Sequence, residues 1–334
     1  MGQLIDGVWH ERRIKAEGVG GRFERPETTF RNWVTPDGSP GPSGEGGFPA
    51  ESGRYHLYVS FACPWAHRAL IFRVLKGLAP HIDVSVVHPD MLADGWEFRT
   101  DHPGATGDRL HGLRYLREIY QRAAPEVTCR VTVPVLWDTQ RETIVSNESA
   151  EIIRMFNSAF DGITGNEMDF LPPDLRAEID AVNGRVYEGL NNGVYRTGFA
   201  GEQAAYDEAV ADVFATLDWM EERLSRQRYL AGDRVTEADW RAFPTLVRFD
   251  AVYHGHFKCN RNRIVDFPNL FGYARELFQW PGVAETVNLD HITRHYHYSH
   301  ESINPHRIVP IGPRIDWMAP HGRDALPAAR QAAE

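Results

Sequence analysis

Cysteine is scarce in this sequence of 334 residues, which contains only Cys63, Cys129 and Cys259. A small, odd number of cysteines does not make a disulfide framework and is typical of free thiols in a reducing compartment, so we expect a cytoplasmic protein. No apolar run approaches the ~20 residues that span a bilayer, and the first residues lack the basic and apolar regions of a secretory signal. We therefore expect no membrane partner.

Positive charge is also in deficit. The formal net charge is −10 and no basic run offsets it, which argues against a nucleic-acid partner. Histidines cluster near the C-terminus, at positions 291, 295, 297 and 300, but their spacing fits no closed tetrahedral site and no cysteine accompanies them. We therefore expect no metal.

The stretch from Tyr55 to Leu70 contains the clearest chemical signal. Apolar residues alternate from Tyr55 to Phe61, as in a half-buried strand, and recur with helical spacing from Pro64 onward. Proline is best tolerated at the first helical position, which makes Cys63 the N-cap. Unpaired N–H groups and the helix dipole stabilise a thiolate there by roughly 1–2 kcal/mol, or about one pKa unit. The pattern predicts a nucleophilic cysteine; the alternative is a small buried apolar residue.

A dithiol redox motif would place a second cysteine three residues after Cys63, where this sequence has Ala66. Any redox chemistry of Cys63 must therefore form a disulfide with an external thiol.

The segments that follow predict a β-α-β unit. Residues 82–88 alternate as a second strand, which the intervening helix should make parallel to the first. Residues 89–130 form a long polar insertion with one predicted helix, from Leu110 to Gln121. An insertion of this size is more often functional than idle.

An antiparallel hairpin is predicted at residues 131–138 and 143–146, followed by a helix at 150–160 that Asn147-Glu148-Ser149 caps. Pro134 lies inside the first of these strands, which requires a sheet edge, a bulge or a special bond such as a cis peptide. The order β-α-β, then β-β-α, indicates a thioredoxin-like α/β domain.

The second half of the chain is predicted to be helical, most clearly at 175–191 and 204–224. Thr236-Glu237-Ala238-Asp239 has the form of a capping box and opens a further helix. We expect an N-terminal arm and Gly/Pro-rich linker at 1–50, a thioredoxin-like domain at 51–161, and an all-α helical-bundle domain with an irregular tail at 173–320.

A thioredoxin-like domain followed by a helical bundle, with cysteine at the first helix N-cap, resembles the glutathione transferase superfamily. The finer resemblance is to the glutathionyl-hydroquinone reductases, also called xi-class glutathione transferases, which are omega-like members. It extends over residues 22–314, and these motifs support it: Phe61-Ala62-Cys63-Pro64-Trp65-Ala66-His67-Arg68, Asp94-Gly95-Trp96, Val133-Pro134-Val135-Leu136-Trp137-Asp138, Val194-Tyr195-Arg196-Thr197-Gly198-Phe199-Ala200, Arg248-Phe249-Asp250-Ala251-Val252-Tyr253, Phe257-Lys258-Cys259-Asn260 and Ser302-Ile303-Asn304-Pro305.

The resemblance implies a glutathione-dependent reductase. Cys63 would attack the glutathionyl sulfur of a glutathionyl-hydroquinone, release the hydroquinone, and be regenerated when a second glutathione removes the first as oxidised glutathione. Glutathione is then a co-substrate, and the partners are these small molecules. The family is dimeric, so a homodimer is expected.

The resemblance also implies the residues of the glutathione site. Val133, before Pro134, would offer main-chain groups to the tripeptide, as an added strand does. Glu148 and Ser149 would hold the γ-glutamyl end at a helix N-terminus. Arg130 would pair with a carboxylate and Trp96 would cover the tripeptide. The alternatives are a cap for Ser149, a core residue for Trp96 and a surface charge for Arg130.

Three tyrosines match the family's active-site tyrosines. By resemblance, Tyr195 is the proton donor, and Tyr253 and Tyr296 stabilise the thiolate. The alternative for each is a place in an aromatic core. The segment around Tyr296 has histidine where the family usually shows a second tyrosine.

Two other functions fit the same sequence. An omega-like thiol transferase or dehydroascorbate reductase would share Cys63 but should not need three phenols. A non-catalytic glutathione-transferase-like binding module would have a Cys63 of ordinary reactivity and no turnover. Cys129 and Cys259 are predicted to be structural.

Overall fold

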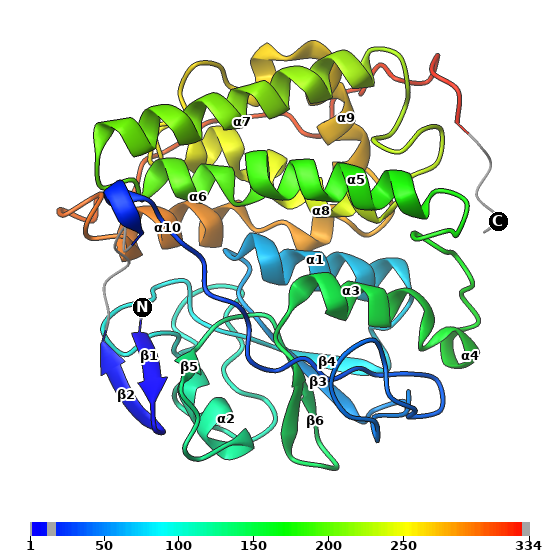
Figure 1. The fold of residues 1–334 in the computed structure, drawn as a ribbon, viewed down its shortest axis with the longest axis vertical. Helices are drawn as coiled ribbons and strands as arrows, with labels where there is room; N and C mark the ends of the chain where they lie inside the picture. Colours follow the sequence, from blue (N-terminus) through cyan, green and yellow to red (C-terminus); the bar gives the residue numbers. More distant parts are fainter. Residues whose placement is uncertain (1, 12–17, 329–334) are drawn as a thin grey trace. The chain divides into compact units, whose positions relative to one another are not determined.

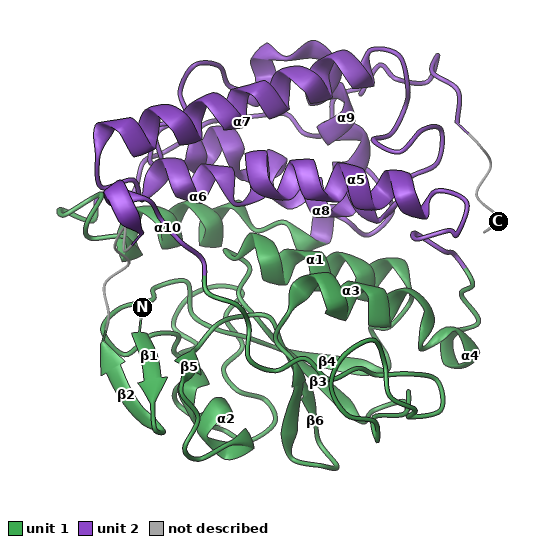
Figure 2. Cartoon of the chain, viewed as in Figure 1, with its two compact units in different colours: residues 1–13, 26–167, 286–307 green, residues 14–25, 168–285, 308–334 purple. Residues whose placement is uncertain are grey.

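The computed structural model describes residues 2–11 and 18–328. The chain divides into two compact units (Figure 2). Unit 1 comprises Met1–Arg13, Pro26–Glu167 and Thr286–Arg307. Unit 2 comprises Ile14–Arg25, Met168–Glu285 and Ile308–Glu334. Each unit is therefore assembled from segments that are distant in the sequence.

A four-stranded mixed sheet organises unit 1, with strand order β4-β3-β6-β7. β3 runs parallel to β4 and antiparallel to β6, and β6 and β7 form the predicted antiparallel hairpin. The strands are β3 (Tyr55–Val59), β4 (Ile82–Val86), β6 (Val135–Asp138) and β7 (Thr143–Ser146). This is the thioredoxin-like order that the sequence predicted.

Helices α1 (Pro64–Leu75) and α3 (Ser149–Ser158) pack against each other on one side of this sheet (Figure 1). A short α4 (Asp161–Thr164) follows α3. On α3 the apolar side chains of Ile152, Ile153 and Phe156 are buried, as the helical spacing predicts.

The insertion at 89–130 covers the other side of the sheet, and this corrects the prediction of a half-buried strand. All five residues of β3 are buried. Tyr58 donates a hydrogen bond to Asp108 Oδ1 at 3.2 Å, and its ring lies 5.6 Å from that of Phe98. Because both faces of β3 are covered, its polar His56 is only 3 % exposed and bonds Ser85 Oγ at 2.8 Å.

The helix of the insertion begins later than predicted. α2 spans Leu116–Ala123, not residues 110–121. The carboxylate of Asp108 accepts hydrogen bonds from the main-chain N–H groups of Leu110, His111 and Leu113, at 3.0–3.2 Å. A side chain that takes these donors favours a turn over a helix.

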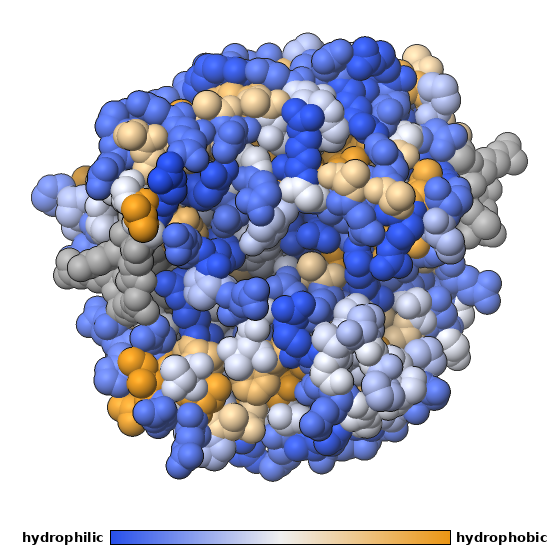
Figure 3. All heavy atoms as spheres, viewed as in Figure 1, coloured by the Kyte–Doolittle hydropathy of each residue, from blue (hydrophilic) through white to orange (hydrophobic). Residues whose placement is uncertain are grey.

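The first residues of the N-terminal arm form a hairpin, and residues 22–36 are mostly irregular. β1 (Gly2–Ile5) pairs with β2 (Val8–Glu11) and with β5 (Cys129–Arg130) in a second, three-stranded sheet. Residues 1 and 12–17 of the predicted arm lie outside the described residues. Most of the surface in view is hydrophilic, with an apolar group at the lower left, where Figure 1 shows β1 and β2 (Figure 3). Val8 of this hairpin is 60 % exposed.

Unit 2 is helical, as predicted. The capping box of Thr236 and Asp239 is present at the start of α8. Within the described ranges no helix is both long enough and apolar enough to cross a membrane. The α-helices of unit 2 are α5 (Arg176–Val186), continued by a π-helical segment (Tyr187–Asn191), α6 (Gly193–Gly198), α7 (Gln203–Leu224), α8 (Glu237–Arg248), continued by a π-helical segment (Phe249–Tyr253), and α9 (Pro268–Phe278).

The segment after the helices of unit 2 returns to unit 1. It contains α10 (Leu289–Ser299), and residues 286–307 cluster with the residues of unit 1 (Figure 2). His67 Nε2 of α1 lies 2.7 Å from Thr286 Oγ1, a hydrogen bond between groups 219 residues apart.

Candidate active site

Cys63 occupies the N-cap of α1, with Pro64 at the first position of the helix, as the sequence predicts. Its backbone is extended, at φ −77° and ψ 121°, and its carbonyl accepts the first intrahelical hydrogen bond from His67 N at 3.0 Å. The side chain is half-buried. The thiol therefore lies at the positive end of the helix dipole and is open to an incoming reactant.

The thiol contacts the segment that leads into β6. Cys63 Sγ lies 3.5 Å from the carbonyl oxygen of Val133, to which a protonated thiol donates. The peptide bond between Val133 and Pro134 is cis, one of the forms that the sequence left open. Val133 and Cys63 are thus brought together, although 70 residues separate them.

Glu148 and Ser149 stand at the N-terminus of α3, where the sequence predicts the cap. Glu148 is the N-cap, and its Oε1 accepts a hydrogen bond from Ala150 N at 3.0 Å. Its Oε2 accepts from Thr28 Oγ1 at 3.3 Å. Ser149, for which a cap was the alternative, is the first residue of the helix and is 3 % exposed.

Arg130 and Trp96 lie in different parts of unit 1. Arg130 is half-buried on the short strand β5, where it is paired with Gln3 of β1. Trp96 is 6 % exposed, and its ring stacks on that of His295, with 4.8 Å between centroids and 20° between planes. Trp96 is therefore part of the packed wall of unit 1.

Tyr296 lies on α10, within unit 1, whereas the other two tyrosines belong to unit 2. It is 1 % exposed, and the rings of His295 and His300 meet it edge-on, with centroids 5.5 and 5.3 Å away. Sequence reasoning weighed these histidines only as metal ligands and missed their contacts with Trp96 and Tyr296.

Tyr195 and Tyr253 lie together in an aromatic cluster of unit 2 with Phe199 and Phe257. Their ring centroids are 6.1 Å apart, and each lies about as close to Phe257, at 5.4 and 5.5 Å. Tyr195 is half-buried and Tyr253 is fully buried. Gly198 permits this packing, because a Cβ there would lie 2.2 Å from Phe257 Cγ. We call these four rings the unit 2 aromatic cluster.

A cation from the N-terminal segment accompanies this cluster. The guanidinium of Arg25 lies 4.9 Å from the centroid of the Tyr195 ring, and its Nε donates to Asn192 Oδ1 at 3.0 Å. Phe23 places its ring 5.5 Å from that of Phe199. The aromatic residues and arginines before residue 36 indicate that this segment packs on other residues, but the sequence does not indicate which residues these are.

The other two thiols are buried. Burial raises the pKa of Cys129 to about 11 and that of Cys259 to about 12. Both are therefore protonated at neutral pH, whereas Cys63 is half-buried at a helix start. In the part of the chain that the structure describes, no group of three or more His, Cys, Asp or Glu side chains is placed to hold a metal ion.

Two family models match the chain. The model described as glutathione S-transferase, N-terminal domain, matches residues 62–159, and the model described as glutathione S-transferase, C-terminal domain, matches residues 203–276.

Three relatives are similar over nearly the whole chain. Glutathionyl-hydroquinone reductase YqjG of Escherichia coli is 58 % identical over 97 % of this chain and 99 % of its own. The glutathione-bound structure of YqjG has a TM-score of 0.90, with 56 % identity over 97 % and 99 % of the two chains. Glutathionyl-hydroquinone reductase PcpF of Sphingobium chlorophenolicum is 51 % identical over 94 % and 96 %. A Xi class glutathione transferase from Natrialba magadii has a TM-score of 0.89, with 52 % identity over 98 % of each chain.

Proposed function

Since this chain belongs to the glutathionyl-hydroquinone reductases of the glutathione transferase family, we propose that it reduces glutathionyl-hydroquinones with glutathione through a mixed disulfide on Cys63. The observation that supports this most is the position of Cys63, at the N-cap of α1 and half-buried. A thiolate so placed is a nucleophile at neutral pH.

In the first step the Cys63 thiolate attacks the glutathionyl sulfur of the substrate. A Cys63–glutathione disulfide forms, the bond between sulfur and the aromatic carbon breaks, and that carbon takes up a proton to give the hydroquinone. In the second step the thiolate of a second glutathione attacks the glutathionyl sulfur of the mixed disulfide. Oxidised glutathione leaves and the Cys63 thiolate is restored. The hydroquinone carbon is thus reduced at the expense of one free glutathione thiol and the substrate's own thioether sulfur, which leave joined as the disulfide.

The glutathione site is proposed to lie on unit 1. The carbonyl of Val133 would accept a main-chain N–H of the tripeptide, in the manner of an added strand. That carbonyl is also the acceptor for the Cys63 thiol, so bound glutathione would compete for it. Ser149 at the start of α3 would receive the γ-glutamyl carboxylate, with Glu148 beside it. Arg130 would add a charge and Trp96 a ring face.

The phenols are proposed to handle the proton. Tyr195, half-buried and next to the Arg25 cation, would donate the proton that the departing hydroquinone takes up. Tyr253 and Tyr296 would donate hydrogen bonds to the thiolate, which favours its ionised form. Three phenols are more than a simple thiol transferase requires.

The proposal is tested by supplying glutathionyl-menadiol and glutathione and following menadiol release. The wild-type protein should release menadiol with one oxidised glutathione per turnover, and Cys63→Ala should not. Cys129→Ala, which removes a buried and protonated thiol, is the matched control and should turn over like wild type. No release by wild type, or equal release by Cys63→Ala, rejects the assignment.

We also propose a cytoplasmic location and a homodimer. Three cysteines, all free, fit a reducing compartment. The dimer is an expectation from the family, and sedimentation of the purified protein tests it: a monomer at micromolar concentration would contradict it.

A further inference from the structure

Helix α10 is fixed to the catalytic side of unit 1 by several contacts. His291 donates from Nε2 to the carbonyl of Pro103 at 2.7 Å, and its ring meets that of Phe61, two residues before Cys63, with 5.4 Å between centroids. Gly104 allows the close approach, since a Cβ there would lie 3.0 Å from His291 Nε2. The main-chain N–H of Met91 donates to Ser299 Oγ at 3.0 Å, at the other end of the helix.

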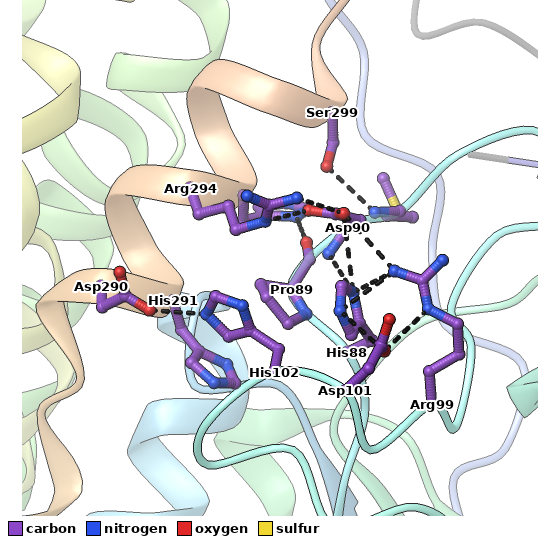
Figure 4. Close-up of polar contacts among 12 residues, drawn as sticks. His88, Pro89, Asp90, Arg99, Asp101, His102, Asp290, His291, Arg294 and Ser299 are labelled. Atoms are coloured by element: carbon purple, nitrogen blue, oxygen red, sulfur yellow. Dashed lines mark hydrogen bonds and ion pairs between the residues drawn. The ribbon is translucent and has the colours of Figure 1, made fainter. Parts of the chain in front are cut away.

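The centre of this contact is a paired ion bridge. Nε and Nη2 of Arg294 donate to the two carboxylate oxygens of Asp90, each at 2.7 Å (Figure 4). The carboxylate is 5 % exposed, and Nη2 of Arg99 lies 3.5 Å from it on the side of His88. A two-pronged arginine–carboxylate pair fixes orientation as well as distance. A buried carboxylate that lost its partner would be costly.

His295, the residue after Arg294, connects the bridge between Arg294 and Asp90 to Trp96. Nδ1 of His295 donates to the carbonyl of Pro89 at 2.8 Å, directly before Asp90. With Nδ1 so engaged, the imidazole ring is held flat against Trp96, 4.8 Å between centroids. Tyr296 follows in the same turn of α10 and rests against His295. Three consecutive residues of α10 thus pair with Asp90, support Trp96 and supply a proposed active-site phenol.

We propose that Asp90, Arg294 and His295 are positioning residues that set the affinity for glutathione by holding Trp96 in place. They act through Trp96 and are not themselves catalytic. The inference rests on the proposed function, because it takes Trp96 as a wall of the glutathione site. The dipole of α1 acts on Cys63 without the bridge, and Tyr296 also packs against His300, so loss of the bridge should change the reactivity of Cys63 much less than the affinity for glutathione.

The primary test is Arg294→Met, which keeps the length of the side chain and removes the charge. The matched control is Arg307→Met: both arginines have 32 % exposed side chains, and both lie over the ring of Tyr298, at 4.5 and 5.4 Å. Glutathione affinity is measured by titration calorimetry, the rate of Cys63 alkylation by iodoacetamide is measured on the free protein, and thermal midpoints monitor folding.

Loss of one aromatic stack predicts about a fivefold weaker glutathione affinity for Arg294→Met. The alkylation rate should stay within about twofold of wild type, since the N-terminus of α1 is unchanged and Tyr296 keeps its contact with His300. Arg307→Met should match wild type in both measurements. Equal affinities for the two variants, or a fall in affinity matched by a fall in alkylation rate, overturns the inference.

A double-mutant cycle with Trp96→Phe decides whether Arg294 acts through Trp96. If it does, Arg294→Met weakens binding much less in the Trp96→Phe protein than in wild type. Additive effects overturn the inference. Should Arg294→Met fail to fold, two substitutions at His295 replace it: Asn keeps a donor for Pro89 and loses the ring stack, and Phe keeps the stack and loses the donor. Weaker binding by His295→Asn than by His295→Phe supports the role of the stack, and equal binding rejects it.

These measurements are separable from the proposed function. Calorimetry reports glutathione binding whether or not menadiol is released. If the protein does not release menadiol but the effects of Arg294→Met and Trp96→Phe on glutathione affinity are non-additive, the reaction is rejected and the positioning role stands. If menadiol is released but the two effects are additive, the reaction stands and the positioning role is rejected.

Discussion

Three of the proposed functional groups of unit 1 stand at the ends of backbone elements, whereas the two of unit 2 stand inside an aromatic cluster. Cys63 caps α1, Ser149 begins α3, and Val133 precedes β6. Tyr195 and Tyr253 are instead held by neighbouring rings. The backbone supplies charge and hydrogen bonds to the first set, and packing supplies position to the second. Substitutions in the first set should therefore remove a nucleophile or a hydrogen bond, and substitutions in the second set should remove a hydroxyl while the ring keeps its packing.

The largest expected effect is at the helix start of unit 1. Cys63→Ser should lose reduction of glutathionyl-menadiol by about a thousandfold or more, because an oxygen nucleophile cannot form the mixed disulfide. The serine variant should still conjugate glutathione to an electrophile such as chlorodinitrobenzene, since the glutathione site is intact. Reduction retained in this variant would show that Cys63 is not the nucleophile.

The next effect distinguishes the two phenols of the unit 2 aromatic cluster. Tyr195→Phe removes the proposed proton donor and should lower kcat for menadiol release by about 10²–10³-fold. Tyr253→Phe removes only a hydrogen bond to the thiolate and should lower it by about tenfold. Both keep the ring, so the packing is preserved. Single-turnover release measures the step, and equal losses would refute the division of roles.

We expect low pH to destabilise unit 1 more than unit 2. Burial lowers the pKa of four histidines of unit 1, at positions 56, 88, 111 and 291. The pKa of His56 is lowered to about 4 from 6.5, so between these pH values the unfolded chain binds more protons than the folded one. The free energy of unfolding then falls as pH falls, by roughly 3 kcal/mol for His56 between pH 7 and 4.

His56→Gln keeps a donor for Ser85 and should flatten this pH dependence, whereas substitution of the exposed His306 by Asn should not. Denaturant unfolding at pH 7, 5.5 and 4.5 measures the slope. Hydrogen exchange at pH 5, corrected for the intrinsic rate, should show unit 1 amides opening before those of unit 2. Earlier opening of unit 2 would contradict the assignment of acid sensitivity to unit 1.

The smallest effect concerns binding at the start of α3. Ser149→Ala should raise KM for glutathione about tenfold with kcat unchanged, because a hydrogen bond to a charged group is lost equally in the ground and transition states. Ser158→Ala, at the exposed end of the same helix, is the matched control. A change in kcat with constant KM would place Ser149 in the chemical step instead.

The features that the sequence predicted are those encoded locally. The N-cap at Cys63 followed from Pro64 and a change of apolar spacing, and the capping box at Thr236 followed from four consecutive residues. The strand order followed from the succession of strands and helices. In the site, the resemblance proposed the residues, but the sequence did not say which of Asn147, Glu148 and Ser149 is the N-cap of α3.

The features that it did not predict depend on distant partners. Asp90 and Arg294 are 204 residues apart, and no sequence pattern around either residue predicts their ion pair. The stack of His295 on Trp96 likewise needs the return of α10 to unit 1. The start of α2 was misplaced because the Asp108 side chain holds the main-chain N–H groups of residues 110–113 in a turn, and the helix begins only at Leu116.

The central claim is that the backbone at the start of α1 ionises Cys63, and a pH titration of its alkylation rate tests this most directly. Iodoacetamide should label Cys63 with an apparent pKa clearly below the ~8.5 of an ordinary cysteine, because the helix N-terminus outweighs the weak donation of a thiol to the Val133 carbonyl. Cys129 and Cys259, buried and protonated, should remain unlabelled in the folded protein. An ordinary pKa for Cys63 would contradict the account.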